Sequence, residues 1–271
     1  MSLRVWNRAV IISWSVVIAA CAARAPLRPV GAAVSDPTAI DAFTQATKPC
    51  TGLKTLTAEI RLSGRAGSEK IRGTLHAGFT APAALRFEAV APFGPPVFIL
   101  AGRDNRATLL LPRDNRVLPD ADVAQLLERL TGLALAADDV RLILSGCLTE
   151  GGTPVDGRSW PNGWRAVTVG AGITAYLGEA GNGTVVVAAD HGAWRVDYSN
   201  HLNGFARTVR IRSTSAAGGN AASMVDISAV LDQLEINTGI DEKAFVIDVP
   251  AGAIPMTLDD LRAVAPLRGS N

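Results

Sequence analysis

Residues 53–64 read LKTLTAEIRLSG, and residues 69–80 read EKIRGTLHAGFT. In both stretches an apolar side chain stands at nearly every second position, with a polar or charged side chain between. A period of two is typical of antiparallel β-strands that have one face in water and the other against a core. The following stretch, ALRFEAV at 84–90, continues the pattern. These segments predict a sheet with one wet face and one dry face.

The same alternation returns in the second half of the chain, over residues 164–236. Tight turns are indicated by Asp-Asn pairs in the first half, at 104–105 and 114–115, and by Asn-Gly pairs such as the one at 162–163. Helical patterns are short: one follows Pro37, two occupy residues 121–132 and 136–146, and the last begins near Thr257. We expect ten or eleven strands and about four short helices, in a mainly β (α+β) chain.

A sheet this wide exposes an apolar face that a few short helices cannot fully cover. We therefore expect a curled antiparallel sheet that forms an incomplete β-barrel, and an incompletely filled curl leaves a hollow. The alternative is a curl closed by its own side chains, and the pattern alone leaves both open. The candidates for the inward, cavity-lining face are Ile60, Leu62, Leu75, Phe79, Phe87, Val196, Val209 and Ile211.

The N-terminal residues have the layout of a secretory signal. Arg4 and Arg8 precede an apolar run at 9–20, which is short for a membrane span. The run IAAC at 18–21 resembles the lipobox of bacterial lipoproteins, which implies cleavage before Cys21 and acylation of that residue. An ordinary signal peptide with an incidental cysteine is the alternative. Ala22 follows where an inner-membrane retention signal has Asp, which favours the periplasmic face of the outer membrane.

We therefore expect a signal peptide at 1–20, a lipidated tether at 21–35 and a single domain at 36–271. Loss of two arginines with the signal leaves 24 of the 26 basic residues against 25 acidic ones, which argues against nucleic acid as a partner. Cys50 and Cys147 are a possible disulfide in an oxidising compartment, or buried thiols in a reducing one.

The sequence contains no recognisable set of catalytic residues. GAGITA at 170–175 fits a dinucleotide fingerprint, but the glycine-rich continuation disfavours the helix that the fingerprint requires. The three histidines stand in no hydrolase or metal-site motif, and the aspartate pairs fall at expected helix starts. We expect no enzyme, no metal and no cofactor. A cleft in which Ser, His and Asp side chains converge would instead indicate a hydrolase.

Several segments together resemble the LolB and LolA group of lipoprotein-handling proteins. They are the strands around LTAEIRLSGRAG and IRGTLHAGFTAP, the hairpin LRFEAVAPFGPPVFILAG, the helical pair LLERLTGLALAADDVRLILSG, and FVIDVPAGAIPMTLDDLR. The resemblance implies an incomplete barrel with short helices as a lid over an apolar cavity. It also implies a projecting loop with an apolar residue, which here is Phe93 between Pro92 and Gly94. Phe93 folded back into the barrel mouth is the alternative.

The expected function follows from the predicted signal peptide and lipobox and from the resemblance to the LolB and LolA group. The protein would bind acyl chains of lipoproteins or lipids and help deliver them to the membrane, with a LolA-like periplasmic carrier as a possible partner. The alternative is a structural or assembly lipoprotein that docks a protein partner without lipid transfer.

Overall fold

The structure is a computed structural model that describes residues 28–170, 172–181, 183–192, 194–213, 224–264 and 266–267. The predicted signal peptide, Cys21 and the first part of the predicted tether lie outside the described residues.

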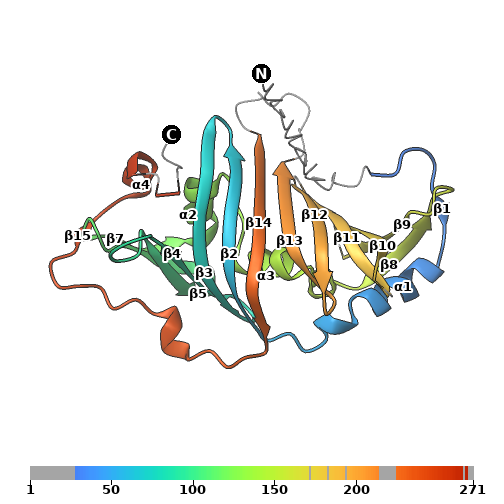
Figure 1. The fold of residues 1–271 in the computed structure, drawn as a ribbon, viewed down its shortest axis with the longest axis horizontal. Coiled ribbons are helices and arrows are strands. Elements are labelled where there is room, and N and C mark those ends of the chain that lie inside the picture. The colour runs from blue at the N-terminus through green and yellow to red at the C-terminus, as the bar shows by residue number, and fades with distance from the viewer. Residues whose placement is uncertain are drawn as a thin grey trace, which may run out of the picture.

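One open sheet dominates the fold (Figure 1). Within the described residues it has fifteen strands, and its two edge strands do not pair with each other, so the curled sheet is an incomplete barrel. In chain order the strands are β1 Val34–Ser35, β2 Thr55–Ala66, β3 Glu69–Thr80, β4 Ala84–Val90, β5 Ile99–Arg103, β6 Arg106–Leu111, β7 Arg116–Asp122, β8 Pro154–Ser159, β9 Arg165–Val169, β10 Ile173–Ala180, β11 Gly183–His191, β12 Trp194–Leu202, β13 Phe205–Ser213, β14 Val225–Ile236 and β15 Ile254–Pro255.

The sheet is built from two meanders. Its spatial order is β1-β8-β9-β10-β11-β12-β13-β14-β2-β3-β4-β5-β6-β7-β15, and β7 with β15 is the one parallel pair among the described strands. The long strands β14 and β2 join the two meanders. A Cβ atom at Gly64 would lie 2.1 Å from the Asp226 carbonyl oxygen, so glycine is required where these strands approach.

In Figure 1, α2 and α3 lie behind the central strands, and their buried residues join the apolar core of the sheet, as the lid prediction requires. α1 (Thr38–Ala46) packs against β8 to β11, α2 (Val123–Thr131) and α3 (Ala137–Ser145) cover the central strands, and α4 (Leu258–Val264) packs on α2. Three short 3-10 helices are η1 Lys48–Cys50, η2 Leu148–Gly151 and η4 Glu242–Phe245. None of the described helices combines the length and hydropathy needed to cross a membrane.

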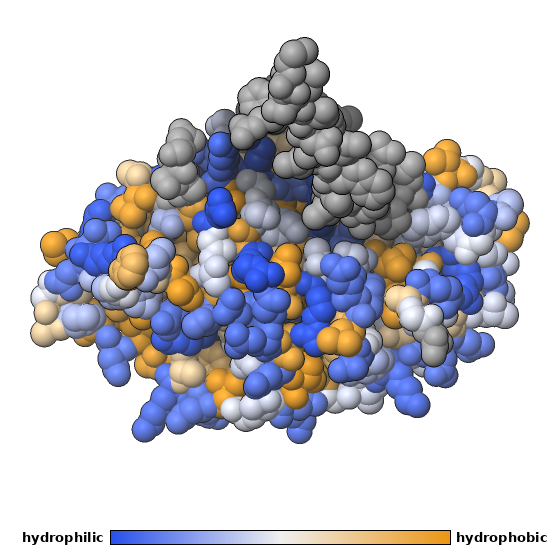
Figure 2. All heavy atoms as spheres, viewed as in Figure 1, coloured by the Kyte–Doolittle hydropathy of each residue, from blue (hydrophilic) through white to orange (hydrophobic). Residues whose placement is uncertain are grey.

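The strand count exceeds the ten or eleven expected from the sequence. β1 and β15 have two residues each, too few to show an alternating pattern. β7 (RVLPDAD) and β8 (PVDGRS) contain proline and residues that are rare in strands. The predicted one-sided character is correct. In β2, buried Leu56, Ala58 and Ile60 alternate with more exposed neighbours, and Figure 2 shows hydrophilic residues spread over the outward face.

Candidate functional site

The lid is held by capped helices with an apolar face. In α2, Val123, Leu126, Leu127 and Leu130 are buried at helical spacing. The Asp122 carboxylate accepts a hydrogen bond from the Gln125 amide at 2.9 Å, which caps the first turn. The sequence therefore forms helices here that turn leucines toward the sheet.

Asn105 ties the starts of both lid helices to the turn between β5 and β6. Its main-chain oxygen accepts from the Val123 amide at 3.0 Å, and its side-chain oxygen accepts from the Ala137 amide at 3.0 Å. Its φ of 60° lies in the left-handed region that asparagine tolerates. One turn residue thus fixes where α2 and α3 begin.

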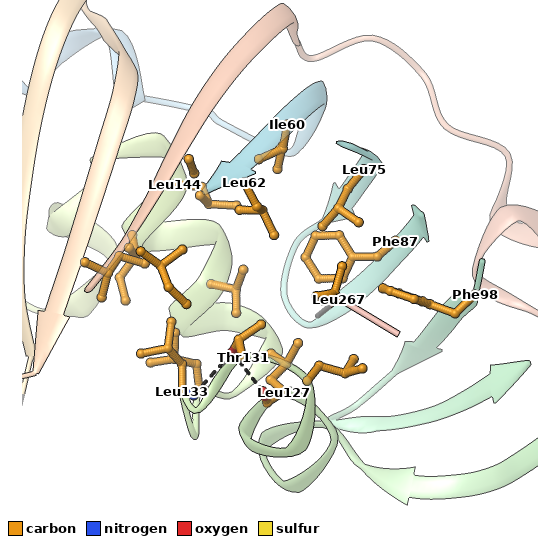
Figure 3. Close-up of a pocket in the computed structure, with 17 residues that line it drawn as sticks. Ile60, Leu62, Leu75, Phe87, Phe98, Leu127, Thr131, Leu133, Leu144 and Leu267 are labelled. Carbon is orange, nitrogen blue, oxygen red and sulfur yellow. Dashed lines mark hydrogen bonds between the residues drawn. The ribbon is translucent and has the colours of Figure 1, made fainter. Parts of the chain in front are cut away.

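An apolar cavity of about 80 Å³ lies between the lid and the sheet (Figure 3). The sheet supplies Ile60, Leu62, Leu75, Phe87 and others, while the helices and the connection between them supply the opposite wall. The lining residues are Ile60, Leu62, Leu75, Phe87, Phe98, Leu127, Leu130, Thr131, Leu133, Leu135, Val140, Ile143, Leu144, Ile211, Ile227, Ala229 and Leu267.

Thr131 is the one polar residue among the described residues that line the cavity. Its hydroxyl donates to the Leu127 carbonyl at 2.8 Å and accepts from the Leu133 amide at 3.2 Å. The hydroxyl is therefore satisfied within the lid and offers little to a ligand. The described residues that line the cavity suit an apolar ligand, and none of them is an acid or a base. No cluster of metal-ligand residues occurs in the part of the chain that the structure describes.

The cavity is small in this state. A water molecule needs about 10 to 15 Å³ of such space, so 80 Å³ is room for about six water-sized groups. That space holds a short length of hydrocarbon chain, and a longer chain requires part of the lining to move.

The structure brings together five of the eight inward candidates around the cavity. Ile60, Leu62, Leu75, Phe87 and Ile211 line it. The other three pack in the core outside the lining. They are Phe79, whose ring meets that of Phe87 edge to face at 5.4 Å, together with Val196 and Val209.

Sequence reasoning missed the lid half of the lining and Phe98. The buried leucines of α2 repeat at helical spacing, which was a usable signal. Phe98 is 1% exposed and follows the proline-rich loop, where no periodic pattern marks a buried ring. Leu267 follows α4 and lines the cavity through contacts with residues far away in the sequence, which a local pattern does not reveal.

The Phe93 loop projects from the sheet and is braced from behind. Pro92, Phe93 and Gly94 are exposed, and Phe93 is 89% exposed, so its ring does not fold back into the barrel. The Arg113 guanidinium donates to the Phe93 carbonyl at 2.7 Å and to the Pro95 carbonyl at 3.1 Å. The loop therefore presents an apolar ring on a supported backbone.

Cys50 and Cys147 form a disulfide, with 5.4 Å between their α-carbons. The bond joins the end of η1 to the residue that follows the Gly146 cap of α3. Leu53 and Phe205 pack around it in a small separate cluster. The disulfide thus fixes the end of α3, whose beginning is fixed by Asn105.

The second half of the predicted tether is attached to the sheet. The Arg28 guanidinium donates to Asp197 at 2.8 Å, to Asp190 at 3.0 Å and to the main-chain oxygens of Ala189 and Val196. It also lies over the Tyr176 ring at 4.8 Å. Burial, with the adjacent Asp190 carboxylate, raises the pKa of Tyr176, so its phenol stays protonated and donates to Asp190. We call Arg28 and these partners the Arg28 clamp.

No family model matches the sequence, and no curated protein matches it. Solved structures resemble the chain over most of its length, among them the following three. A domain described as an outer membrane lipoprotein-sorting protein from Vibrio parahaemolyticus is 11% identical, covers 74% of this chain and 93% of its own, and has a TM-score of 0.45. A DUF1329 family protein from Desulfovibrio piger is 10% identical, covers 77% and 96%, and scores 0.45.

The third is the lipoprotein LppX of Mycobacterium tuberculosis, 11% identical, covering 76% of this chain and 99% of its own, with a TM-score of 0.33. Two of the three descriptions name lipoproteins. The low identities and TM-scores leave the function to be argued from the cavity.

Proposed function

We propose that this protein is a non-enzymatic lipoprotein that binds acyl chains of lipoproteins or lipids in the lid cavity and delivers them to a membrane. In this proposal Cys21 carries the lipid anchor, and the domain works at the periplasmic face of the bacterial outer membrane. A LolA-like carrier is the proposed donor of the acylated cargo.

The composition of the cavity lining carries the proposal. Sixteen of the seventeen described residues that line the cavity are apolar, and the hydroxyl of the remaining one is satisfied inside the lid. Transfer of an acyl chain from water to such a surface is favourable by about 0.8 kcal/mol for each buried methylene. A bilayer offers the chain a similar environment, so release costs little where the two meet.

The position of the Arg28 clamp supports a membrane role for the Phe93 loop. Strand directions alternate from β12 to β4 through five antiparallel pairings, so the start of β12 and the end of β4 lie at the same end of the sheet. The clamp holds Arg28 near the start of β12, and Phe93 follows the end of β4. An anchor at Cys21 would therefore bring the Phe93 end toward the lipid.

Native mass spectrometry of the chain from Ala22 onward, exported to a periplasm and purified without detergent, tests acyl binding. This form contains every described residue. We expect a bound lipid or acylated species, and Leu75→Asn should reduce the bound fraction about tenfold. The reason is that an unsatisfied amide in the cavity costs about 1 to 3 kcal/mol.

Leu85→Asn is the matched control, because Leu85 is fully buried on the same sheet but outside the cavity lining. It should destabilise the fold similarly and leave acyl binding intact in the folded fraction. A wild-type protein that carries no lipid and takes up no added palmitate or lipopeptide would rule out the carrier function.

Phe93→Ala should slow acyl transfer to vesicles about tenfold. An aromatic side chain that enters the bilayer contributes about 1.5 to 3 kcal/mol. Palmitate affinity in solution should stay within about twofold, because Phe93 lies outside the cavity lining. Transfer of a fluorescent acyl chain to vesicles measures the effect. Leu202→Ala, at an exposed position at the opposite end of the sheet, should transfer at the wild-type rate, and equal slowing by both variants would contradict a specific role for Phe93.

A second candidate function is docking of a protein partner without lipid transfer. The exposed Phe93 ring on its braced loop favours this candidate, since rigid aromatic anchors are common in protein interfaces. An empty cavity, combined with loss of partner capture in Phe93→Ala, would support docking over transfer.

A further inference from the structure

The segment after α4 returns to the lid cavity and places a leucine in it. Leu267 is 3% exposed and is one of the cavity-lining residues. Figure 3 shows its side chain in the apolar cluster that contains Phe87 and Leu127. The described end of the chain thus fills part of the space in which the proposed function places an acyl chain.

A free strand edge receives this segment. β3 pairs with β2 along its whole length, but β4 pairs only with its second half, from Thr74 to Thr80. The Arg72 amide, beyond the end of β4, donates to the Leu267 carbonyl at 3.1 Å. The segment therefore takes the place that β4 leaves empty.

Gly73 makes room for the leucine side chain. A Cβ atom at Gly73 would lie 3.2 Å from the Leu267 Cδ2 atom, closer than most side chains tolerate. Among the described residues, the Arg72–Leu267 bond is the one main-chain hydrogen bond between residues 266–267 and the sheet. A single such bond contributes only about 0.5 to 1.5 kcal/mol. The space beside Gly73 therefore fits the leucine side chain, but the hydrogen bond holds the segment to β3 only weakly.

We propose that Leu267 is a resident plug of the acyl site, and that an incoming acyl chain enters by displacing it from the edge of β3. This inference rests on the proposed acyl-binding function. Leu267 is a branched hydrocarbon in a wall that is apolar apart from Thr131, so the ligand replaces it with chemistry of the same kind. The plug keeps the apolar surface covered between cargoes. The apparent affinity is then the intrinsic affinity multiplied by the fraction of molecules in which the plug is displaced.

Palmitate affinity of the chain from Ala22 onward tests the plug. Leu267→Ala should bind palmitate about tenfold more tightly than the wild type, a change equivalent to about 1.4 kcal/mol. Leu261→Ala is the matched control, because Leu261 is fully buried in α4 but outside the cavity lining. The control should lower thermal stability without raising palmitate affinity.

Hydrogen exchange at the Arg72 amide gives a second, independent measurement. In the wild type, palmitate should increase the exchange rate of this amide several-fold, because the Leu267 carbonyl leaves it. In Leu267→Ala the amide should exchange faster before ligand is added, and palmitate should change it little. The wild-type part of this measurement remains informative if the variant binds palmitate weakly because it is poorly folded.

The outcomes separate the plug from the function on which it rests. If the wild type binds palmitate while Leu267→Ala binds it no better and the Arg72 amide stays protected, the plug is wrong and acyl binding stands. If neither protein binds palmitate, the proposed function itself fails, and the plug fails with it.

Discussion

Removing the disulfide between Cys50 and Cys147 should lower the free energy of unfolding by about 4 to 5 kcal/mol. The bond closes a loop across a sequence separation of 97. For a loop of about 100 residues, the reduced chain entropy of the unfolded state corresponds to about 4.7 kcal/mol. The bond also fixes the end of α3, so the lid should become less protected against hydrogen exchange than the central strands.

Urea denaturation of the chain from Ala22 onward, with and without dithiothreitol, measures this effect. Cys50→Ala with Cys147→Ala is the control variant; alanine avoids a buried hydroxyl at Cys147, which is fully buried. The variant should match the reduced wild type and be insensitive to reductant. A difference below about 1 kcal/mol between oxidised and reduced wild type would show that the crosslink contributes far less than its loop length predicts.

Asp197→Ala should lower the free energy of unfolding by about 3 to 5 kcal/mol. Asp197 is 6% exposed, and its carboxylate pairs with Arg28 and with Arg212. The variant leaves two guanidinium groups without this shared counter-charge, and breaking a buried pair from one side costs about that amount. The loss should also free the segment around Arg28, which limited proteolysis near this residue detects.

Asp226→Ala is the matched control for a surface pair. Asp226 accepts two hydrogen bonds from Arg210, and both side chains are more than 40% exposed. Exposed ion pairs contribute about 0 to 1 kcal/mol, so this variant should unfold close to the wild type. Arg28→Ala combined with Asp197→Ala should cost less than the sum of the single changes. Additive losses would show that the two residues are not coupled.

The sequence predicted the sheet well because burial on one face imposes a period of two on each strand. It predicted α1 through Pro37 and α4 through Thr257, whose hydroxyl accepts from the Asp260 amide as a capping residue does. It did not separate residues that line the cavity from residues that pack beside it. Phe79 and Phe87 share a face and touch each other, yet only Phe87 lines the cavity. That difference depends on where the lid lies, which a strand pattern does not contain.

The sequence also did not predict the polar contacts between residues that are far apart in the chain. The turn around Asn105 was predicted from its Asp-Asn pair, but not its hydrogen bonds to the starts of α2 and α3. Arg28 stands in an Ala- and Pro-rich stretch that reads as a tether, while its partners Asp190 and Asp197 are more than 160 residues away. Neither contact leaves a local pattern, because the groups meet only after the sheet has curled.

The Arg28 clamp would set the length of the free tether between a lipid anchor at Cys21 and the folded domain. Between Cys21 and Arg28 there are seven residue steps, against fifteen from Cys21 to Asp36, where the predicted domain begins. Fully extended, these distances are about 25 Å and about 54 Å. A domain on the shorter tether would explore a volume about ten times smaller. The effective concentration of the Phe93 end at the bilayer that holds the anchor would therefore be about ten times higher. A lipid-anchored protein of this design would serve the membrane that holds it in preference to any other surface.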